Sequence, residues 1–215
     1  MDFSRPNFNQ RIVIRNGRVI DPTQVLDQVA DIYIADGLIS NIGNAPVGFK
    51  PDMEFDAEGM LVIPGAVDVC ARVREPGQTQ KGNIHSETHA AAAAGVTHLC
   101  CPPDTNPVID TRAVAALIQE RAYQSGYAHV MPIGALTKGL DGQQLSEMHS
   151  LREAGCIGVS QLRHPVKDAQ VLLRCLEYAS TFDLIVFFQS EEQSISPAGG
   201  VHAGPTATRL GLPGI

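Results

Sequence analysis

The stretch that decides the fold is PGAVDVCARVREPG, residues 64–77. It opens with a Pro-Gly pair, continues through a short apolar run at 65–69 that is typical of a buried strand, and ends in Arg74 and the turn pair Pro76-Gly77. Parallel sheets built from βα units carry their functional side chains just past the carboxyl ends of the strands. We therefore place the candidate site at the end of this strand.

Downstream of this stretch, short apolar strands alternate with amphipathic helices, which is typical of βα units. Strands are predicted at 65–69, 97–101, 129–133, 156–160 and 184–188. Helices are predicted at 86–94, at 143–154, after Asp110 as an N-cap, and around Leu172, Cys175, Leu176 and Ala179. An open doubly wound sheet and an eight-stranded barrel both fit this order. The lack of a Gly-rich phosphate loop after the first strand favours the barrel.

Upstream, the chain is rich in strand patterns instead. Apolar residues alternate in 11–21 around Asn16-Gly17 and in 29–43 around Asp36-Gly37, and both dipeptides are typical of hairpin turns. We expect a small β-rich domain over residues 1–60 and the first five βα units of a barrel over residues 61–215. Because five strands cannot close an eight-stranded barrel, we expect the C-terminal remainder of the barrel to be absent.

Composition and charge narrow the class of protein. The 215 residues are 44% hydrophobic and 18% charged, which is the balance of a soluble globular protein. Sixteen Lys and Arg against 23 Asp and Glu give a net charge of −7 without a basic run, which argues against a nucleic-acid partner. No apolar stretch approaches the roughly 20 residues of a membrane span, and no signal-peptide core is present. We expect a cytoplasmic protein with no membrane partner and with reduced cysteines.

The 64–77 stretch resembles the dihydroorotase branch of the cyclic amidohydrolases, whose motif here reads Pro-Gly, an apolar pair, Asp, then His-x-His-x-Arg-Glu-Pro-Gly. Further matches follow in order at 90–97 (AAAAAGVT), 103–110 (PDTNPVID), 134–139 (GALTKG), 154–166 and 176–188. The resemblance implies a TIM-like (β/α)8 barrel of the metal-dependent hydrolase type, built on a divalent metal site. It also implies that residues 1–60 form half of a composite β-sandwich.

Active members of that family use zinc to activate a water molecule, which attacks the amide carbonyl of the dihydroorotate ring. The resemblance places the zinc ligands at four positions of this chain that carry other residues, namely Cys70, Arg72, Gln161 and Gln189. Zinc needs lone-pair donors, and a charged arginine offers none. One thiolate and two amides do not make a zinc shell either. We therefore expect no metal, no cofactor and no catalytic residue.

The substrate side of the motif is closer to the family pattern. Arg74 matches the family arginine that forks onto the substrate carboxylate, a geometry suited to a planar two-oxygen group. Asp104 stands where the family has asparagine, which removes a donor and adds repulsion toward an anion. We interpret Arg74 and Asp104 as vestigial substrate-binding residues. The simplest expectation is that Arg74 pairs with Asp104 or Glu75 and props the strand end.

Two further groups of charged or metal-binding residue types have simple structural interpretations. Arg72 is expected to be neutralised by Glu191 or Glu192, because an unpaired buried cation is costly. His85 and His89 lie four residues apart, but HSETH is not the His-Glu-x-x-His motif of zinc proteases. The spacing favours a solvent-facing start of a helix.

The resemblance implies a catalytically inactive dihydroorotase homologue, a pseudoenzyme that serves as structural partner of the aspartate transcarbamoylase catalytic chain in de novo pyrimidine biosynthesis. We expect such a protein to form homo- and hetero-oligomers. The alternative is an active cyclic amidohydrolase with non-standard metal ligands, and the joint change at four ligand positions argues against it. A small-molecule sensor that uses the pocket around Arg74 is a third, weaker hypothesis.

Overall fold

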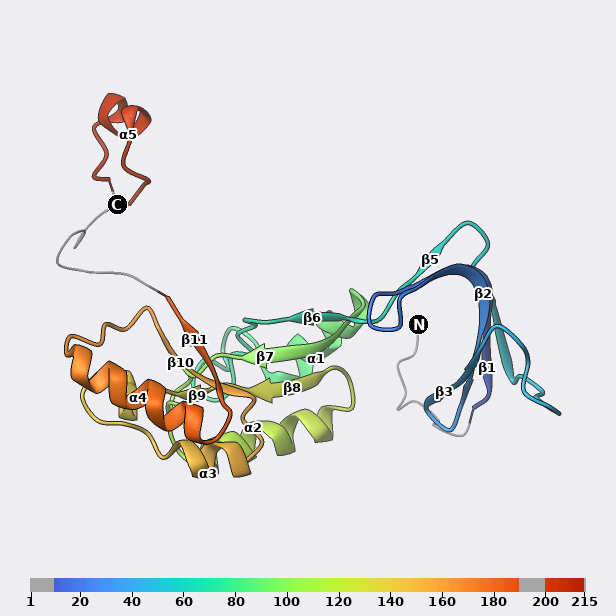
Figure 1. The fold of residues 1–215 in the computed structure, drawn as a ribbon, viewed down its shortest axis with the longest axis horizontal. Helices are drawn as coiled ribbons and strands as arrows, with labels where there is room; N and C mark the ends of the chain where they lie inside the picture. The colour runs from blue at the N-terminus through green and yellow to red at the C-terminus, as the bar shows by residue number, and fades with distance from the viewer. Residues whose placement is uncertain (1–9, 190–199, 215) are drawn as a thin grey trace. The chain divides into compact units, whose positions relative to one another are not determined.

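The computed structural model describes residues 10–189 and 200–214. By its internal contacts the chain divides into two compact units, Met1–Gly65 and Ala66–Ile215 (Figure 1). The first unit has one sheet and the second has two.

The first unit is a sheet of mixed direction. Its strands are β1 (Ile12–Asp21), β2 (Leu26–Ala35), β3 (Leu38–Ile42), β4 (Met53–Asp56) and β5 (Leu61–Val62). The order is β3-β2-β1-β4, with β5 also on β1. β1 and β2 are antiparallel, as are β2 and β3, whereas β4 and β5 both run parallel to β1. The long strand β1 is therefore the element that every other strand except β3 contacts directly.

The hairpin turn expected at Asn16-Gly17 is wrong, because these residues lie inside β1. The pairing register with β2 shifts between Ile14 and Gly17, Asn16 has a φ of 62°, and its N–H donates to Asp31 Oδ1 at 3.0 Å. Asparagine tolerates the left-handed conformation both in turns and in β-bulges. The chain reverses instead at residues 22–25, while the turn at Asp36-Gly37 lies between β2 and β3 as predicted.

The second unit contains two parallel sheets. Its strands are β6 (Ala66–Asp68), β7 (Val96–Cys101), β8 (His129–Pro132), β9 (Gly134–Ala135), β10 (Gly158–Leu162) and β11 (Ile185–Phe188). They are ordered β6-β7-β8 and β9-β10-β11, so neighbours in space are neighbours in sequence. A doubly wound sheet reverses its strand order, whereas a barrel adds each strand beside the last. The sequential order is that of a barrel.

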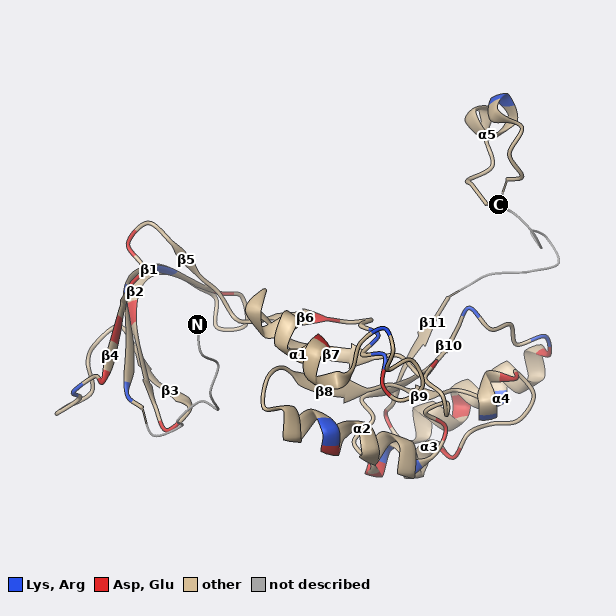
Figure 2. Ribbon diagram, turned by 180° about the vertical axis from the view of Figure 1, so that it is seen from behind, with Lys and Arg blue, Asp and Glu red and all other residues tan. Residues whose placement is uncertain are grey.

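Five α-helices and one 3₁₀ helix complete the described part of this unit. They are α1 (Ile84–Ala93), α2 (Arg112–Ser125), η1 (Lys138–Leu140), α3 (Met148–Glu153), α4 (Ala169–Thr181) and α5 (Pro205–Leu210). Helices α2, α3 and α4 lie along one side of the strands in both ribbon views (Figures 1 and 2). Among the described residues, no helix has the length and apolar character needed to cross a membrane.

The predicted elements are present, with local corrections. The predicted strand at 129–133 corresponds to β8, and the unpredicted short strand β9 follows it and pairs with β10 in the other sheet. The N-cap of α2 is Thr111, not Asp110, whose carboxylate instead accepts the Gly139 N–H at 2.9 Å. The helix predicted at 143–154 is shorter, because the chain before it forms a bridge between Thr137 and Leu145.

The core of the second unit lies between the strands and these helices. One continuous cluster of buried residues joins the strands to α2, α3 and α4. Within α2, Ile118 has no exposed surface, whereas its neighbour Leu117 is 42% exposed. One face of α2 therefore packs in the core while the neighbouring face is exposed to solvent, as expected for an amphipathic helix.

Replacing Ile118 with alanine should lower the free energy of unfolding by about 2–5 kcal/mol, because it removes a fully buried side chain and leaves a cavity. The matched substitution Leu117→Ala should change it by no more than about 0.5 kcal/mol. Urea unfolding followed by circular dichroism measures both. Equal effects of the two changes would show that α2 does not present the described face to the core.

The cysteines differ in a way that chemical labelling can test. Cys70 is exposed, whereas the other four cysteines are buried. Burial raises the pKa of Cys101 and of Cys156 to about 12, and that of Cys175 to about 11. A thiol-reactive reagent at pH 8 should modify Cys70 rapidly and the buried thiols only after unfolding, because the thiolate is the reactive form. Peptide mass spectrometry identifies the site, and rapid labelling of Cys101 or Cys156 would contradict this prediction.

Candidate functional site

The candidate site begins where β6 ends and the chain continues along β7. The N–H of Ala71 donates to the Cys100 carbonyl at 2.9 Å, which keeps this segment beside β7. Val73 is fully buried in the core, whereas Cys70 and Arg72 are exposed. Arg72 therefore lies at the surface beside the buried Val73, so the segment that anchors to β7 also presents a charged side chain to solvent.

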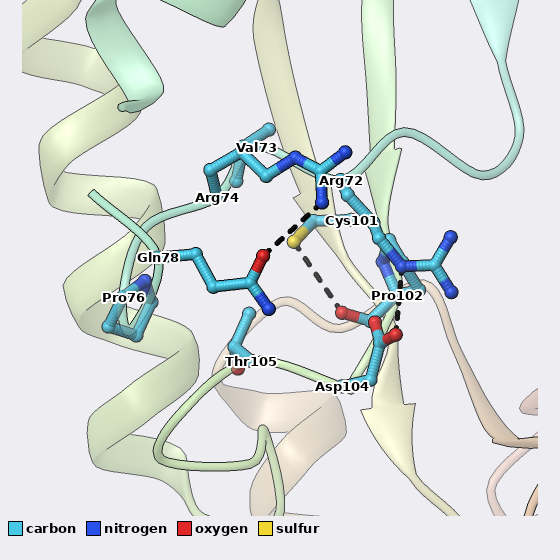
Figure 3. A pocket seen from close by; sticks show the side chains of 9 residues that line it. All are labelled: Arg72, Val73, Arg74, Pro76, Gln78, Cys101, Pro102, Asp104 and Thr105. Atoms are coloured by element: carbon cyan, nitrogen blue, oxygen red, sulfur yellow. Dashed lines mark hydrogen bonds and ion pairs between the residues drawn. The ribbon is translucent and has the colours of Figure 1, made fainter. Parts of the chain in front are cut away.

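A pocket opens between this segment and the loop that follows β7 (Figure 3). It is lined by Arg72, Val73, Arg74, Pro76, Gln78, Cys101, Pro102, Asp104 and Thr105. The structure therefore brings together Arg74 and Asp104, the two residues that the sequence predicts for substrate binding. It adds Arg72 and Gln78, of which Gln78 was not anticipated.

The ion pair in this pocket involves Arg72 rather than Arg74. Nε of Arg72 donates to Oδ2 of Asp104 at 2.8 Å, and the side chains are 48% and 27% exposed. The hydrogen bond to Asp104 raises the pKa of Arg72, so its charge is fixed. Figure 3 shows the two side chains directed toward each other from the two loops.

The expected pairing of Arg74 with Asp104 or Glu75 is wrong. Nη1 of Arg74 donates to Oε1 of Gln78 at 3.3 Å. Glu75 instead accepts the N–H of Ile84, the first residue of α1, at 3.1 Å. A carboxylate at a helix N-terminus satisfies a donor that the helix leaves open. The expected partners of Arg72, Glu191 and Glu192, lie outside the described residues.

The turn after Arg74 fits tightly against the loop after β7. Arg74 is a non-glycine residue with a φ of 62°, and Gly77 has a φ of 105°. A Cβ on Gly77 would lie 2.8 Å from the carbonyl oxygen of Asn106 and 2.9 Å from its nitrogen. Only glycine fits both this backbone conformation and this close approach. The packing of this turn therefore fixes the position of the Arg74 backbone beside the loop after β7.

At the end of β10, Gln161 is fully buried and its amide is satisfied at both ends. Its Oε1 accepts from the Thr137 hydroxyl at 2.9 Å, and its Nε2 donates to the Leu140 carbonyl at 3.1 Å. Thr137 Oγ1 also accepts the Gly142 N–H at 2.9 Å. An aspartate here would have no donor for the Leu140 carbonyl. Thr137, which lies in the GALTKG stretch, was not singled out from the sequence. Its position as a polar residue just past the third predicted strand was the signal that could have identified it.

The two other expected ligand positions, Gln189 and Cys70, also make hydrogen bonds within the protein. Gln189 Oε1 accepts from Arg163 Nε at 3.3 Å, and the backbone N–H of Cys70 donates to Asp68 Oδ1 at 2.9 Å. In residues 10–189 and 200–214, no three His, Cys, Asp or Glu side chains gather where they could hold a metal ion. A guanidinium and two amides also lack the donor chemistry of zinc, so the residues present do not fit that metal.

The two histidines of α1 pack on a tyrosine. The rings of His85 and His89 both meet Tyr127 edge to face, with centroids 5.2 and 4.8 Å away. His85 is exposed, as expected for a solvent-facing helix start, whereas His89 is partly buried. The spacing of four residues is thus explained by an aromatic contact between α1 and the loop before β8.

A family model and several curated proteins match this chain, and all of them are described as dihydroorotases or as dihydroorotase-like. A family model described as dihydro-orotase-like matches residues 59–215. The chain is 52% identical over 204 residues to a dihydroorotase-like protein of Pseudomonas aeruginosa, and 50% identical over 204 residues to one of Pseudomonas putida. It is 42% identical over 205 residues to a dihydroorotase of Syntrophotalea carbinolica. Each alignment covers 95% of this chain and 48% of the relative, so the chain spans about half the length of these relatives.

Solved structures show the same fold at lower sequence identity. The L-hydantoinase (dihydropyrimidinase) of Arthrobacter aurescens superposes with a TM-score of 0.72 at 18% identity, over 90% of this chain and 45% of that one. The D-hydantoinase of a Thermus species gives 0.63 at 23% identity, over 86% and 41%. These enzymes have the TIM-barrel fold of metal-dependent hydrolases. The family model, which covers most of the chain, and the relatives at 42 to 52% identity show that this chain belongs to the dihydroorotase-like family.

Proposed function

We propose that this chain is part of a catalytically inactive dihydroorotase homologue, a cytoplasmic pseudoenzyme that serves as structural partner of the aspartate transcarbamoylase catalytic chain in de novo pyrimidine biosynthesis. The observation that carries the proposal is the Arg72–Asp104 ion pair. A guanidinium that is fixed in its charged form by a 2.8 Å contact occupies a position at which active members bind zinc through histidine. A divalent cation beside it would be repelled.

The other ligand positions support the same conclusion. Gln161 uses its amide to satisfy Thr137 and Leu140, and Gln189 accepts from Arg163. Without zinc, water at this site keeps its ordinary pKa and is a poor nucleophile at neutral pH. The described residues hold the ends of the strands in place, which is a structural task, and they supply no substitute for the activated water.

The proposal of a partner rests on the family resemblance and on exposed apolar surface. Leu38 and Ile39 of β3 and Phe55 of β4 are between 51% and 72% exposed. These residues lie on β3 and β4, the two outer strands of the sheet order β3-β2-β1-β4, and they leave apolar side chains available for contact with other protein. Because the relatives are about twice as long as this chain, the rest of the polypeptide is one source of that contact. A direct binding experiment with the aspartate transcarbamoylase catalytic chain is therefore needed to test the proposed partner.

The full-length protein, purified and supplied with excess zinc, should hydrolyse dihydroorotate no faster than a protein-free zinc control. The reason is that Arg72 and Gln161 leave the first and fourth strands without zinc ligands. Absorbance of dihydroorotate measures the rate, and the dihydroorotase of Syntrophotalea carbinolica serves as positive control under identical conditions. Zinc-dependent turnover that the substitution Arg74→Met abolishes would refute the inactive assignment in favour of an amidohydrolase with ligands outside this chain.

The full-length protein should also co-elute with the aspartate transcarbamoylase catalytic chain of the same organism in a defined ratio. Size-exclusion chromatography with light scattering on the two purified proteins, alone and mixed, measures the masses. The proposal expects one species heavier than either protein. Elution of both proteins at their separate masses, at micromolar concentrations, would show that this partner is wrong.

A further inference from the structure

We propose that the pocket between the segment after β6 and the loop after β7 is a binding site for a small phosphate-type dianion, which the guanidinium groups of Arg72 and Arg74 hold together. The ligand class is inorganic phosphate or the phosphate group of a small metabolite. This site goes beyond the proposed structural role. It also does not depend on whether the protein hydrolyses dihydroorotate, so each proposal can fail without the other.

The pocket carries a charge opposite to that of the chain as a whole. Two arginines and one carboxylate, that of Asp104, line it and leave one positive charge, whereas the 215 residues together carry −7. Burial raises the pKa of the lining thiol of Cys101 to about 12, so this thiol stays neutral. Glu75 follows Arg74 in the sequence, but its carboxylate accepts the first N–H of α1. Because clefts lined by one sign of charge concentrate counter-ions, this pocket attracts anions.

Both guanidinium groups retain N–H donors that the protein does not use. Arg72 binds Asp104 through Nε, and within the described part of the chain its two Nη atoms have no hydrogen-bond partner. Arg74 donates to Oε1 of Gln78 at 3.3 Å, so its partner is an uncharged amide and its charge stays uncompensated. In the same described residues, Nε2 of Gln78 is a further donor without a partner. Guanidinium forks and amide N–H groups are donors suited to phosphate oxygens.

The two walls of the pocket are joined by the backbone, so the site is formed before a ligand binds. The N–H of Asn106 donates to the Pro76 carbonyl at 3.2 Å, and Gly77 packs closely against the same asparagine. Figure 3 shows the side chains of Arg72 and Arg74 at the same pocket, each with its guanidinium group beside the partner that it binds. A site whose donors are already positioned loses less conformational entropy on binding.

The number of charges and oxygens distinguishes phosphate from a carboxylate. A carboxylate is planar, and the single fork of Arg74 satisfies both of its oxygens. A phosphate-type dianion has a second charge and a third oxygen, and Arg72 is the group that matches them. The carboxylate of Asp104 opposes any anion, but Arg72 lies 2.8 Å from it and offsets its charge. We therefore expect phosphate binding to need both arginines, whereas a carboxylate held as in the family pattern needs Arg74 and not Arg72.

The test titrates inorganic phosphate at pH 8 into the full-length protein, by isothermal titration calorimetry at constant ionic strength in a phosphate-free buffer. The unsubstituted protein should bind one phosphate per chain, and Arg72→Met and Arg74→Met should each weaken the affinity about tenfold or more. Asp104→Asn should bind at least as tightly as the unsubstituted protein, because it removes a negative charge while an amide oxygen still accepts from Arg72. Arg72→Gln and Arg74→Gln serve as second charge-removing variants should a methionine variant fold poorly. Methyl phosphate, titrated in parallel, shows by its relative affinity whether the ligand is a phosphate ester or free phosphate.

Arg18→Met is the matched control, since Arg18 forms a comparable pair with Asp27 at 2.7 Å in the first unit. It should leave the phosphate affinity unchanged although it removes the same charge. Acetate, titrated under the same conditions, should bind about tenfold more weakly than phosphate or worse, because it has one charge and two oxygens. Equal affinities for acetate and phosphate, no phosphate binding to the unsubstituted protein, or an affinity that Arg72→Met and Arg72→Gln leave unchanged would each overturn the inference. Hydrolysis of dihydroorotate and assembly with a partner are separate measurements, so a failure of this site is distinguishable from a failure of the proposed function.

Discussion

A buried amide group must find both a donor and an acceptor within the protein, and at the end of β10 this requirement holds the carboxyl edge of the barrel unit together. Gln161 meets it by joining Thr137 and the Leu140 carbonyl. Leaving one such group unsatisfied costs about 1–3 kcal/mol. The carboxylate of Asp110 accepts the N–H of Gly139 in the same segment, residues 137–142. The loops after β7 and β9 and the end of β10 are thereby connected to one another.

Parallel strands deliver their final residues to one edge, so whatever follows each strand meets its neighbours there. In this chain those residues bind one another. Arg72 pairs with Asp104, Gln161 binds the loop beside it, and Gln189 accepts from Arg163. A metal site uses the same geometry differently, because its side chains must leave their lone pairs free and directed at a common point. Hydrogen bonds between neighbouring loops and a shared metal are alternative uses of one edge, and the side-chain chemistry decides between them.

Short apolar runs located five of the six strands of the second unit, all except the two-residue strand β9. Such runs mark strands well because buried strands such as β7 and β10 need apolar side chains. Local details were less predictable where one sequence pattern fits two different backbone structures or two neighbouring residues can play the same role. An Asn-Gly pair signals a left-handed backbone, which a hairpin turn and the bulge in β1 both require. Asp110 and Thr111 are both good N-cap types, and their order along the chain does not decide which one caps α2. The pairing of Asp104 with Arg72 rather than Arg74 depends on where the turn at Gly77 points the second arginine, and only the folded backbone determines that.

The turn at residues 74–77 shows why a match to a family motif does not by itself establish a shared function. Gly77 is required because its Cα lies against the backbone of Asn106, and this holds whatever the pocket binds. The Arg-Glu-Pro-Gly pattern is thus accounted for by the packing of two loops and by the cap that Glu75 provides for α1. Chemistry depends on far fewer atoms, namely the donor groups at Cys70, Arg72, Gln161 and Gln189. The match at the turn therefore indicates a shared scaffold, and the proposed loss of activity rests on the side chains at the expected ligand positions alone.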